Sequence, residues 1–374
     1  MSGVPNEKPG DAGPCRVREV VLARGVPAMV LENDAIAATV LPGKGADIYA
    51  LTAKPEGIDV LWKSPWGLLP MDAGVPSAVD SQVAWLDAYA GGWQEIFPSG
   101  GGPCVYRGAE LNFHGEASLA AWDVEIVEAG GAAAEIRCAL RLRRSPFRLE
   151  RTMRLEGDSP VLRLRERVTN EGGEPIEFMW GHHPAYGAPF LSGACRIDTN
   201  ARTVQADDAF DGAANPLAPD GRWPWPRGER DGRAVDLSVV PGADDPPRHT
   251  LAYLGDFQGA HGWYGITNTD LGLGAGLVWP TAVFPYAWFW QEMHASPGYP
   301  WHKSVYVMAI EPFTTSPGQG LAAAIDKSGT QRSLEPGEAL ETELAAVLYR
   351  TRQRISDIAP DGTVTAQPAE EGQA

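Results

Sequence analysis

Two adjacent histidines stand where an apolar run meets a proline, and their side chains could transfer protons. The segment 178–187 reads FMWGHHPAYG, with His182 and His183 at its centre. Neighbouring residues of a strand point to opposite faces, so only one of the two can face a given cleft. An imidazole titrates near neutral pH and suits general acid–base catalysis. The pattern also fits two structural histidines that bind loop carbonyls, and the spacing leaves both interpretations open.

A single carboxylate closes a second apolar run. Glu311 follows residues 305–310 and precedes a proline. Burying a carboxylate is costly unless it is paired or faces a wet cleft. Glu311 is therefore either an ordinary strand-end residue or the acidic partner of a histidine. If His183 faces it, we expect the carboxylate to favour the imidazolium and to raise the pKa of His183.

Other segments carry side chains that could bind a substrate. A glycine follows His114 in a short loop, a glycine-rich segment spans 91–102, and an apolar run spans 286–291. The 91–102 segment lacks the lysine and hydroxyl residues of a phosphate-binding P-loop. An indole ring offers a flat apolar face to a sugar ring, although core filling is its commoner use. The expected substrate contacts are His114, Trp93, Gln94, His182, Trp290 and Gln291.

Composition narrows the class of partner. The chain has 31 basic and 48 acidic residues, a formal net charge of −17, which opposes binding to nucleic acid or to an anionic membrane. We find no secretory leader and no run of eighteen apolar residues, so we expect a cytoplasmic protein. We expect a monomer or a homodimer, and the sequence does not decide between them. The four cysteines are widely spaced, and we expect no metal and no cofactor. A metal site at His294 and His302 is a weaker alternative.

Short apolar runs between Gly, Pro, Asp and Asn residues predict many strands and no long helix. Alternation of charged and apolar residues predicts strands with one buried face. The expected strands are 19–22, 28–32, 36–41, 121–128, 133–142, 147–155, 161–170, 274–279, 286–291 and 305–310. We therefore predict an all-β protein with one large antiparallel β-super-sandwich over residues 19–352, and long loops over 200–250. Residues 1–18 and 353–374 are expected to be flexible.

In order along the chain, short motifs resemble the aldose 1-epimerase (galactose mutarotase-like) family over residues 28–348. The motifs are LPGKGADI at 41–48, DVLW at 59–62, WQEIFP at 93–98, HG at 114–115, HPAY at 183–186, EP at 311–312 and EPGE at 335–338. The resemblance implies a galactose mutarotase-like fold and an isomerase that interconverts the anomers of a free aldose. It makes Glu311 the general base, His183 the general acid and His114 a binding or polarising partner. HPAY differs from the longer motif of typical galactose mutarotases, so the chain resembles a divergent branch and its sugar stays open.

Three alternatives follow from the same residues. The chain could be a catalytically idle carbohydrate-binding member of the same fold. It could cleave glycosides, which needs a second carboxylate beside Glu311, with Glu292 or Glu95 as candidates. It could also epimerise a phosphorylated or sulfonated sugar, which needs a cation near the cleft. The nearest cations by sequence are Arg107, Arg202 and Lys303.

Overall fold

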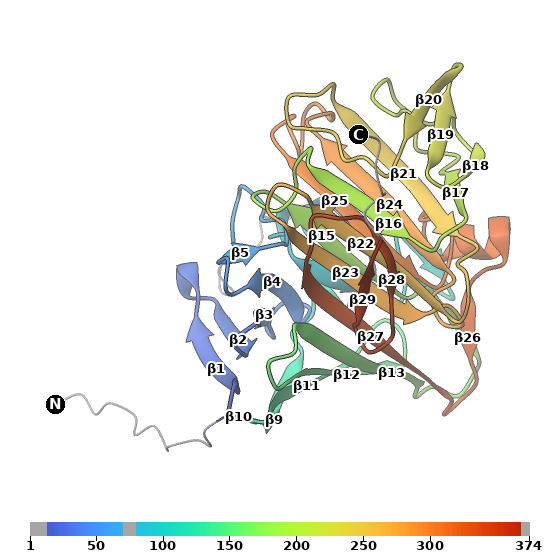
Figure 1. The fold of residues 1–374 in the computed structure, drawn as a ribbon. Helices are drawn as coiled ribbons and strands as arrows, with labels where there is room; N and C mark the ends of the chain where they lie inside the picture. Colours follow the sequence, from blue (N-terminus) through green and yellow to red (C-terminus); the bar gives the residue numbers. More distant parts are fainter. Residues whose placement is uncertain (1–12, 70–79, 368–374) are drawn as a thin grey trace.

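Two large antiparallel sheets form the protein in a computed structural model that describes residues 13–69 and 80–367 (Figure 1). The first sheet has thirteen strands, with β5 (Ile58–Asp59) attached to β4. The other twelve, in spatial order, are β10 (Gly130–Gly131), β1 (Cys15–Val21), β2 (Pro27–Glu32), β3 (Ile36–Leu41), β4 (Asp47–Ala53), β6 (Trp93–Ile96), β15 (Gly181–Gly187), β25 (Tyr306–Phe313), β24 (Tyr286–Met293), β21 (Arg248–Gly255), β17 (Thr203–Ala206) and β18 (Arg222–Pro224).

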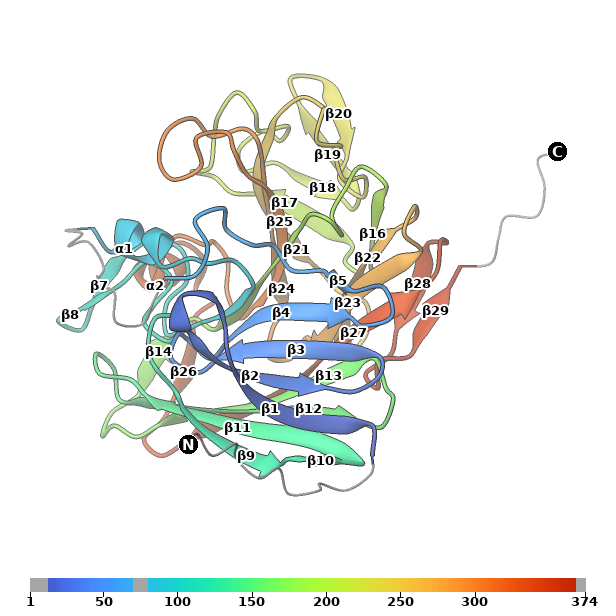
Figure 2. The same ribbon diagram turned by 90° about the vertical axis from the view of Figure 1, so that its left-hand side faces the viewer.

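The second sheet has eight strands and packs on one face of the first. In spatial order they are β16 (Cys195–Thr199), β22 (His261–Asn268), β23 (Leu273–Pro280), β27 (Ala339–Arg350), β13 (Val161–Asn170), β12 (Phe147–Glu156), β11 (Ala133–Arg141) and β9 (Asp123–Glu128). Strands β1 and β2 lie across β11 and β12 (Figure 2). The prediction of one large all-β antiparallel sandwich is confirmed.

Smaller elements decorate the sandwich. Four two-stranded pairs are β7 (Cys104–Tyr106) with β8 (Ala109–Leu111), β14 (Ile176–Phe178) with β26 (Arg332–Leu334), β19 (Arg227–Arg230) with β20 (Arg233–Asp236), and β28 (Ile355–Ile358) with β29 (Val364–Ala366). The helical segments are α1 (Ser81–Asp87), α2 (Leu321–Ala323), η1 (Ala23–Gly25) and η2 (Ala324–Ser328). Among the described residues, no helix is long and apolar enough to cross a membrane.

Alternation along the strands builds the core. In β12, Phe147, Leu149, Met153 and Leu155 are buried between the sheets, while the residues between them reach the outer face. Burying one such side chain contributes about 1.5–3 kcal/mol. The exception in this series is Arg151, a wholly buried cation, and its partners lie beneath the candidate site.

The structure corrects the sequence predictions in four places. Helix α1 was not expected, and it begins at Asp80, whose carboxylate accepts a hydrogen bond from the Gln82 N–H. The segment 200–250 holds β17 to β20 and the start of β21 rather than loops alone. Residues 355–366 were expected to be flexible, but they form a hairpin that buries Ile355 and Ile358. Residues 15–18 were also expected to be flexible, but they form the start of β1 and pair with β2 and β10. The residues of the predicted tails before 13 and after 367 lie outside the described residues.

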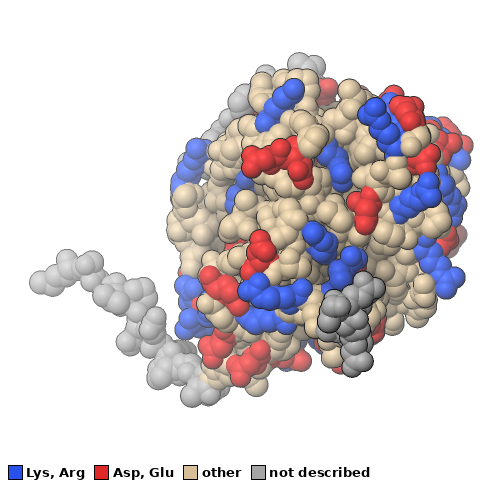
Figure 3. All heavy atoms as spheres, turned by 45° about the horizontal axis from the view of Figure 1, so that its top comes forward, with Lys and Arg blue, Asp and Glu red and all other residues tan. Residues whose placement is uncertain are grey.

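Charge is mixed over the surface despite the net excess of acids. Figure 3 shows Lys and Arg side chains interspersed with Asp and Glu side chains on one face of the molecule. On the outer face of the second sheet, Arg165 of β13 pairs with Glu343 of β27 at 2.9 Å. Such exposed pairs contribute little stability, so we assign them to solubility rather than to function.

Candidate active site

A cavity of about 330 Å³ opens on the face of the first sheet that is turned away from the second sheet. Strands β15, β25, β24 and β21 form its floor, and helix α1 and several loops form its walls. Its volume lies in the range of small-molecule sites, about 300–1,000 Å³. The lining residues are Gln82, Trp85, Leu86, Tyr89, Gly101, Gly102, Phe113, His114, His183, Phe210, His249, Leu251, Trp288, Trp290, Pro300, Trp301, Glu311 and Gly318.

Strand register brings His183 and Glu311 together on this floor. Gly181 pairs with Phe313 and Ala185 with Ala309, so His183 and Glu311 lie opposite each other in β15 and β25. The Nε2 atom of His183 is 3.7 Å from Oε1 of Glu311. Both side chains are almost wholly buried. The two candidate proton-transfer residues therefore share one cavity.

Burial controls the protonation of this pair. It lowers the pKa of His183 to about 4, and the positive charge of Lys44 acts in the same direction. It also raises the pKa of Glu311 well above the usual carboxyl value. We expected Glu311 to raise the pKa of His183, and the structure gives the opposite direction because desolvation by burial is the largest influence on the ring. Both shifts favour the uncharged forms of the pair, a protonated carboxyl group beside a neutral imidazole.

His114 enters the cavity from a loop whose backbone fixes its ring. The Gly101 N–H donates to Nδ1 of His114 at 3.1 Å, and the His114 N–H donates to the Gly101 carbonyl at 3.1 Å. Nδ1 is thus an acceptor, which leaves the proton of the neutral ring on Nε2. Burial, with a contribution from His183, lowers the pKa of His114 well below its ordinary value. His114 is therefore a neutral hydrogen-bond donor next to His183, with ring centroids 5.7 Å apart.

Helix α1 supplies a wall that the sequence analysis missed. Gln82, Trp85, Leu86 and Tyr89 all line the cavity. Their spacing of three, four and seven residues is that of one helix face and could have revealed the element. The hydroxyl of Tyr89 is buried and has no hydrogen-bond partner among the described residues. A buried hydroxyl without a partner at the edge of a cavity marks a place where a polar ligand can bind.

Further residues that the sequence analysis missed lie opposite α1. His249 of β21 lines the cavity, and its Nε2 is 3.5 Å from the buried Glu292 carboxylate. That carboxylate also accepts hydrogen bonds from the N–H groups of Ala295 and Ser296. It thereby anchors the loop that carries Trp301 over the cavity. No local sequence motif indicated these contacts, which join β21, β24 and a loop.

Four of the expected substrate contacts do not line the cavity. Three of them face the core between the sheets: Trp93, His182 and Gln291. Gln94 is on the cavity side of β6 but is wholly buried beneath the surface. The alternation of β15 decides between the two histidines, because His183 faces the cavity and His182 the core. Trp290 and His114 do line the cavity.

His182 belongs to a buried ionic network behind the site. Trp93 donates its indole N–H to Nδ1 of His182 at 3.2 Å, and Nε2 lies 3.0 Å from Glu166. Arg151 lies 3.2 Å from Glu95 and 3.8 Å from Glu166. Burial raises the pKa of each carboxyl group to about 7 and lowers the pKa of His182 to about 4. These residues support β15 and β6 from the core side and do not contact the cavity.

The cavity contents bear on the alternatives. Among its described lining residues, Glu311 is the one carboxylate, and neither lysine nor arginine is present. Glu95 is held in the core network, and Glu292 is occupied by loop N–H groups. The candidate cations Arg107, Arg202 and Lys303 are exposed and do not line the cavity. Of the histidines considered for metal binding, His294 stacks on Tyr306.

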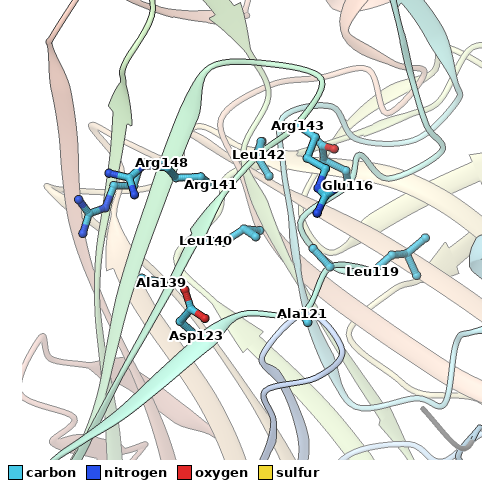
Figure 4. Close-up of a pocket in the computed structure, with 11 residues that line it drawn as sticks. Glu116, Leu119, Ala121, Asp123, Ala139, Leu140, Arg141, Leu142, Arg143 and Arg148 are labelled. Atoms are coloured by element: carbon cyan, nitrogen blue, oxygen red, sulfur yellow. The ribbon is translucent and has the colours of Figure 1, made fainter. Parts of the chain in front are cut away.

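A larger hollow of about 690 Å³ lies elsewhere, between the segment 116–123 and strands β11 and β12 (Figure 4). Two of the arginines that line it are already paired, Arg141 with Glu171 and Arg148 with Glu150, each at 2.8 Å. None of the predicted proton-transfer residues lines it. Volume alone therefore does not make it the site, and the smaller cavity with the histidine–carboxylate pair is the better candidate.

Comparison with known proteins gives the family and the fold. Residues 23–347 match the family described as Domain of unknown function (DUF4432). No curated protein matches the sequence. A candidate aldose 1-epimerase from Klebsiella pneumoniae has a TM-score of 0.68 at 16% identity, with 90% of this chain and 84% of that chain covered. A galactose mutarotase-like protein from Clostridium acetobutylicum has a TM-score of 0.64 at 14% identity, with 90% and 99% covered. The fold is therefore galactose mutarotase-like.

Proposed function

The chain belongs to the DUF4432 family, and we propose that it is a mutarotase that interconverts the anomers of a free, uncharged aldose by acid–base catalysis. The observation that carries the proposal is the buried contact between His183 and Glu311, 3.7 Å apart on the floor of an aromatic cavity. The names of the similar structures, aldose 1-epimerase and galactose mutarotase, support the same reaction class. The resemblance in sequence motifs supports it as well.

The reaction needs two proton transfers, one at each of the two oxygen atoms, O1 and O5, that are bonded to C1. A base removes the proton of the O1 hydroxyl while an acid protonates the ring oxygen O5. The C1–O5 bond breaks as the C1=O1 double bond forms, which gives the open-chain aldehyde. Rotation about C1–C2 exposes the other face of the aldehyde, and O5 adds to it with both protons returned. No electrons are transferred and no leaving group departs.

The protonation state of the pair suits this sequence. In the protonated form that burial favours, the Glu311 carboxyl group can protonate O5 while neutral His183 accepts the O1 proton at Nε2. This exchanges the roles that the family resemblance implies for the two residues. The pair ends with the proton on the imidazole, and ring closure returns it, so each turnover restores the starting state. The Nε2–H of His114 can donate to the oxygen that gains negative charge.

The walls favour a neutral sugar. Trp290 and Trp301 line the cavity, are partly exposed and can offer flat apolar faces to the C–H groups of a sugar ring. Trp85 and Trp288 also line the cavity, but they are buried and stacked on Tyr89 and Phe313. A phosphate or sulfonate would enter a cavity whose described lining includes no cation and one acidic residue, Glu311. Hydrolysis of a glycosidic bond needs two carboxyl groups at the bond, and the described lining provides one. A carbohydrate-binding protein without catalysis would need neither the histidine nor the carboxyl group. It is therefore the second candidate, to be adopted if the chain accelerates anomer exchange of no sugar.

Polarimetry and one-dimensional NMR of anomers test the proposal on a panel of neutral aldoses. Wild type should accelerate anomer exchange of at least one sugar, and His183→Gln and Glu311→Gln should each lower the rate about 10²- to 10⁴-fold. Arg141→Gln, in the larger surface hollow, is the control and should match wild type. Binding of a sugar without acceleration would indicate a carbohydrate-binding protein. Equal activity of wild type and both active-site variants would refute the assigned roles.

A further inference from the structure

A buried chain of polar groups lies behind His183, on the opposite side of β15 from Glu311. Gln94 of β6 is the cross-strand neighbour of His183. Its Nε2 donates to Oδ2 of Asp47 at 2.9 Å and to the Gly91 carbonyl at 2.8 Å. Asp47 in turn forms an ion pair with Lys44. Because both amide hydrogens have acceptors, the orientation of the Gln94 amide is determined, and its Oε1 points away from Asp47.

Two neighbouring buried atoms are left without partners. Among the described residues, neither Oε1 of Gln94 nor Nδ1 of His183 has a hydrogen-bond partner. Cβ atoms of cross-strand neighbours are about 4.5–5.5 Å apart, so these side chains lie within reach of each other. A carbonyl oxygen accepts, and an imidazole nitrogen donates when it carries the proton. Buried polar groups of complementary type at this separation pair directly or through one water molecule.

We propose that Gln94 is a positioning residue that accepts a hydrogen bond from Nδ1–H of His183 and so keeps the lone pair of Nε2 directed at Glu311. Asp47 and Lys44 support it, because a hydrogen bond from the amide nitrogen to a carboxylate polarises the amide and strengthens its oxygen as an acceptor. The role rests on the proposed function only for its catalytic consequence. The tautomer itself is a property of the protein without sugar.

The proposal gives Gln94 a role that a substrate contact would not have. The residue is wholly buried, so a sugar in the cavity cannot reach it without moving His183. Lys44 and Asp47 belong to the motif at 41–48, and the proposal explains why a buried carboxylate and its cation lie beneath the site. His183 and His182 then differ in tautomer. His182 accepts at Nδ1 from Trp93, whereas His183 donates from Nδ1.

NMR of the histidine nitrogens tests the tautomer on the full-length protein. The protein is labelled with ¹⁵N, studied at pH 7.5 without ligand, and the His183 signals are assigned by their loss in His183→Gln. Wild type should show protonated Nδ1 and unprotonated Nε2. In Gln94→Leu the Nε2–H form should become populated, and the mutarotation rate should fall about 10- to 100-fold, as when a histidine loses its orienting partner. Rescue is expected in Gln94→Glu only where the glutamate is ionised and can accept from Nδ1.

Gln291→Leu is the matched control. Gln291 is also wholly buried, and its Oε1 has no partner among the described residues, but it faces the core. Its replacement should change neither the tautomer nor the rate. An Nε2–H tautomer in wild type overturns the proposal, even if Gln94→Leu does not fold. An unchanged Nδ1–H tautomer in a folded Gln94→Leu also overturns it, because an acceptor other than Gln94 would then keep the proton on Nδ1. If wild type shows the expected tautomer but accelerates anomer exchange of no sugar, the proposed function alone is refuted.

Discussion

Acidification from pH 7 to pH 5 should leave kcat/KM for mutarotation almost unchanged. Burial lowers the pKa of His183 to about 4, so about 90% of the imidazole is still neutral at pH 5. A histidine with the ordinary pKa of about 6.5 would be only about 3% neutral at that pH. If the neutral ring accepts the O1 proton, the two cases differ about 30-fold in kcat/KM at pH 5.

The groups around His183 give the sign of this dependence. Burial raises the pKa of Glu311, which favours its protonated form, and burial likewise favours the neutral form of His114. Tyr89 also stays neutral, because burial raises its pKa well above the usual value. The positive charge of Lys44 disfavours the imidazolium form of His183. Activity should therefore fall only below about pH 4 and, at the alkaline end, where Glu311 loses its proton.

Polarimetry between pH 5 and 9 measures the profile, with the buffer rate subtracted because anomerisation is itself catalysed by acid and base. Circular dichroism at each pH checks that the protein is folded. The pKa values from kcat/KM are those of the free enzyme. A loss of activity on acidification with a midpoint near 6.5 would refute the reasoning. A loss as the pH rises through 6.5 would instead identify an imidazolium as the acid, as the motif resemblance implies.

Three other substitutions probe the network, the wall and the loop. Burial raises the pKa of Glu166 from 4.5 to about 7, so stability present below pH 4.5 is lost as the pH rises to 7, by about 3 kcal/mol. In urea unfolding, Glu166→Gln should lose less stability than wild type between pH 5 and 8, and an equal loss would contradict the assignment. Trp290→Leu should raise KM about tenfold with a smaller change in kcat, because about 1.4 kcal/mol of ring stacking is lost, whereas an unchanged KM would place the sugar elsewhere. Gly101→Ala would put Cβ 1.7 Å from the Gly318 carbonyl oxygen and displace the Gly101 N–H that anchors His114. It should therefore lower activity and Tm more than Gly108→Ala, where φ is also positive but no atom lies within 4 Å of the added Cβ.

The sequence predicted the strands best where one face is wet. β13 has the predicted bounds 161–170, because charged residues alternate with apolar ones and breakers mark its ends. β3 also has its predicted bounds, 36–41, but breakers alone delimit it, because Thr39 is its one polar residue. β15 is buried on both faces, so its pattern carries no sign of which histidine faces the cavity. Only the register with β6 and β25 decides this. The family motifs selected His183, but the residue pattern by itself could not.

Residue type was a weaker guide to the substrate contacts. Gln94 and Gln291 have the same side chain and the same burial, yet they lie on opposite faces of the first sheet. Tyr89 and His249 were missed because the segment just after a seven-residue helix and the distant strand β21 reach the cavity only after the sheet has formed. The direction of the His183 pKa shift was also missed. It depends on how completely the pair is removed from water, which local sequence does not state.

The two faces of β15 together explain how a strand without a wet side can carry the proposed proton-transfer residue His183. On the core side, Trp93 donates a hydrogen bond to Nδ1 of His182, and the Glu166 carboxylate lies 3.0 Å from Nε2. Arg151 ties the same carboxylate to Glu95 of β6, the cross-strand neighbour of His182. Buried ionic groups of this kind contribute little net stability, and removing one partner is costly. Their value here is positional, because a strand held from behind keeps His183 at its distance from Glu311 whether or not a sugar is bound.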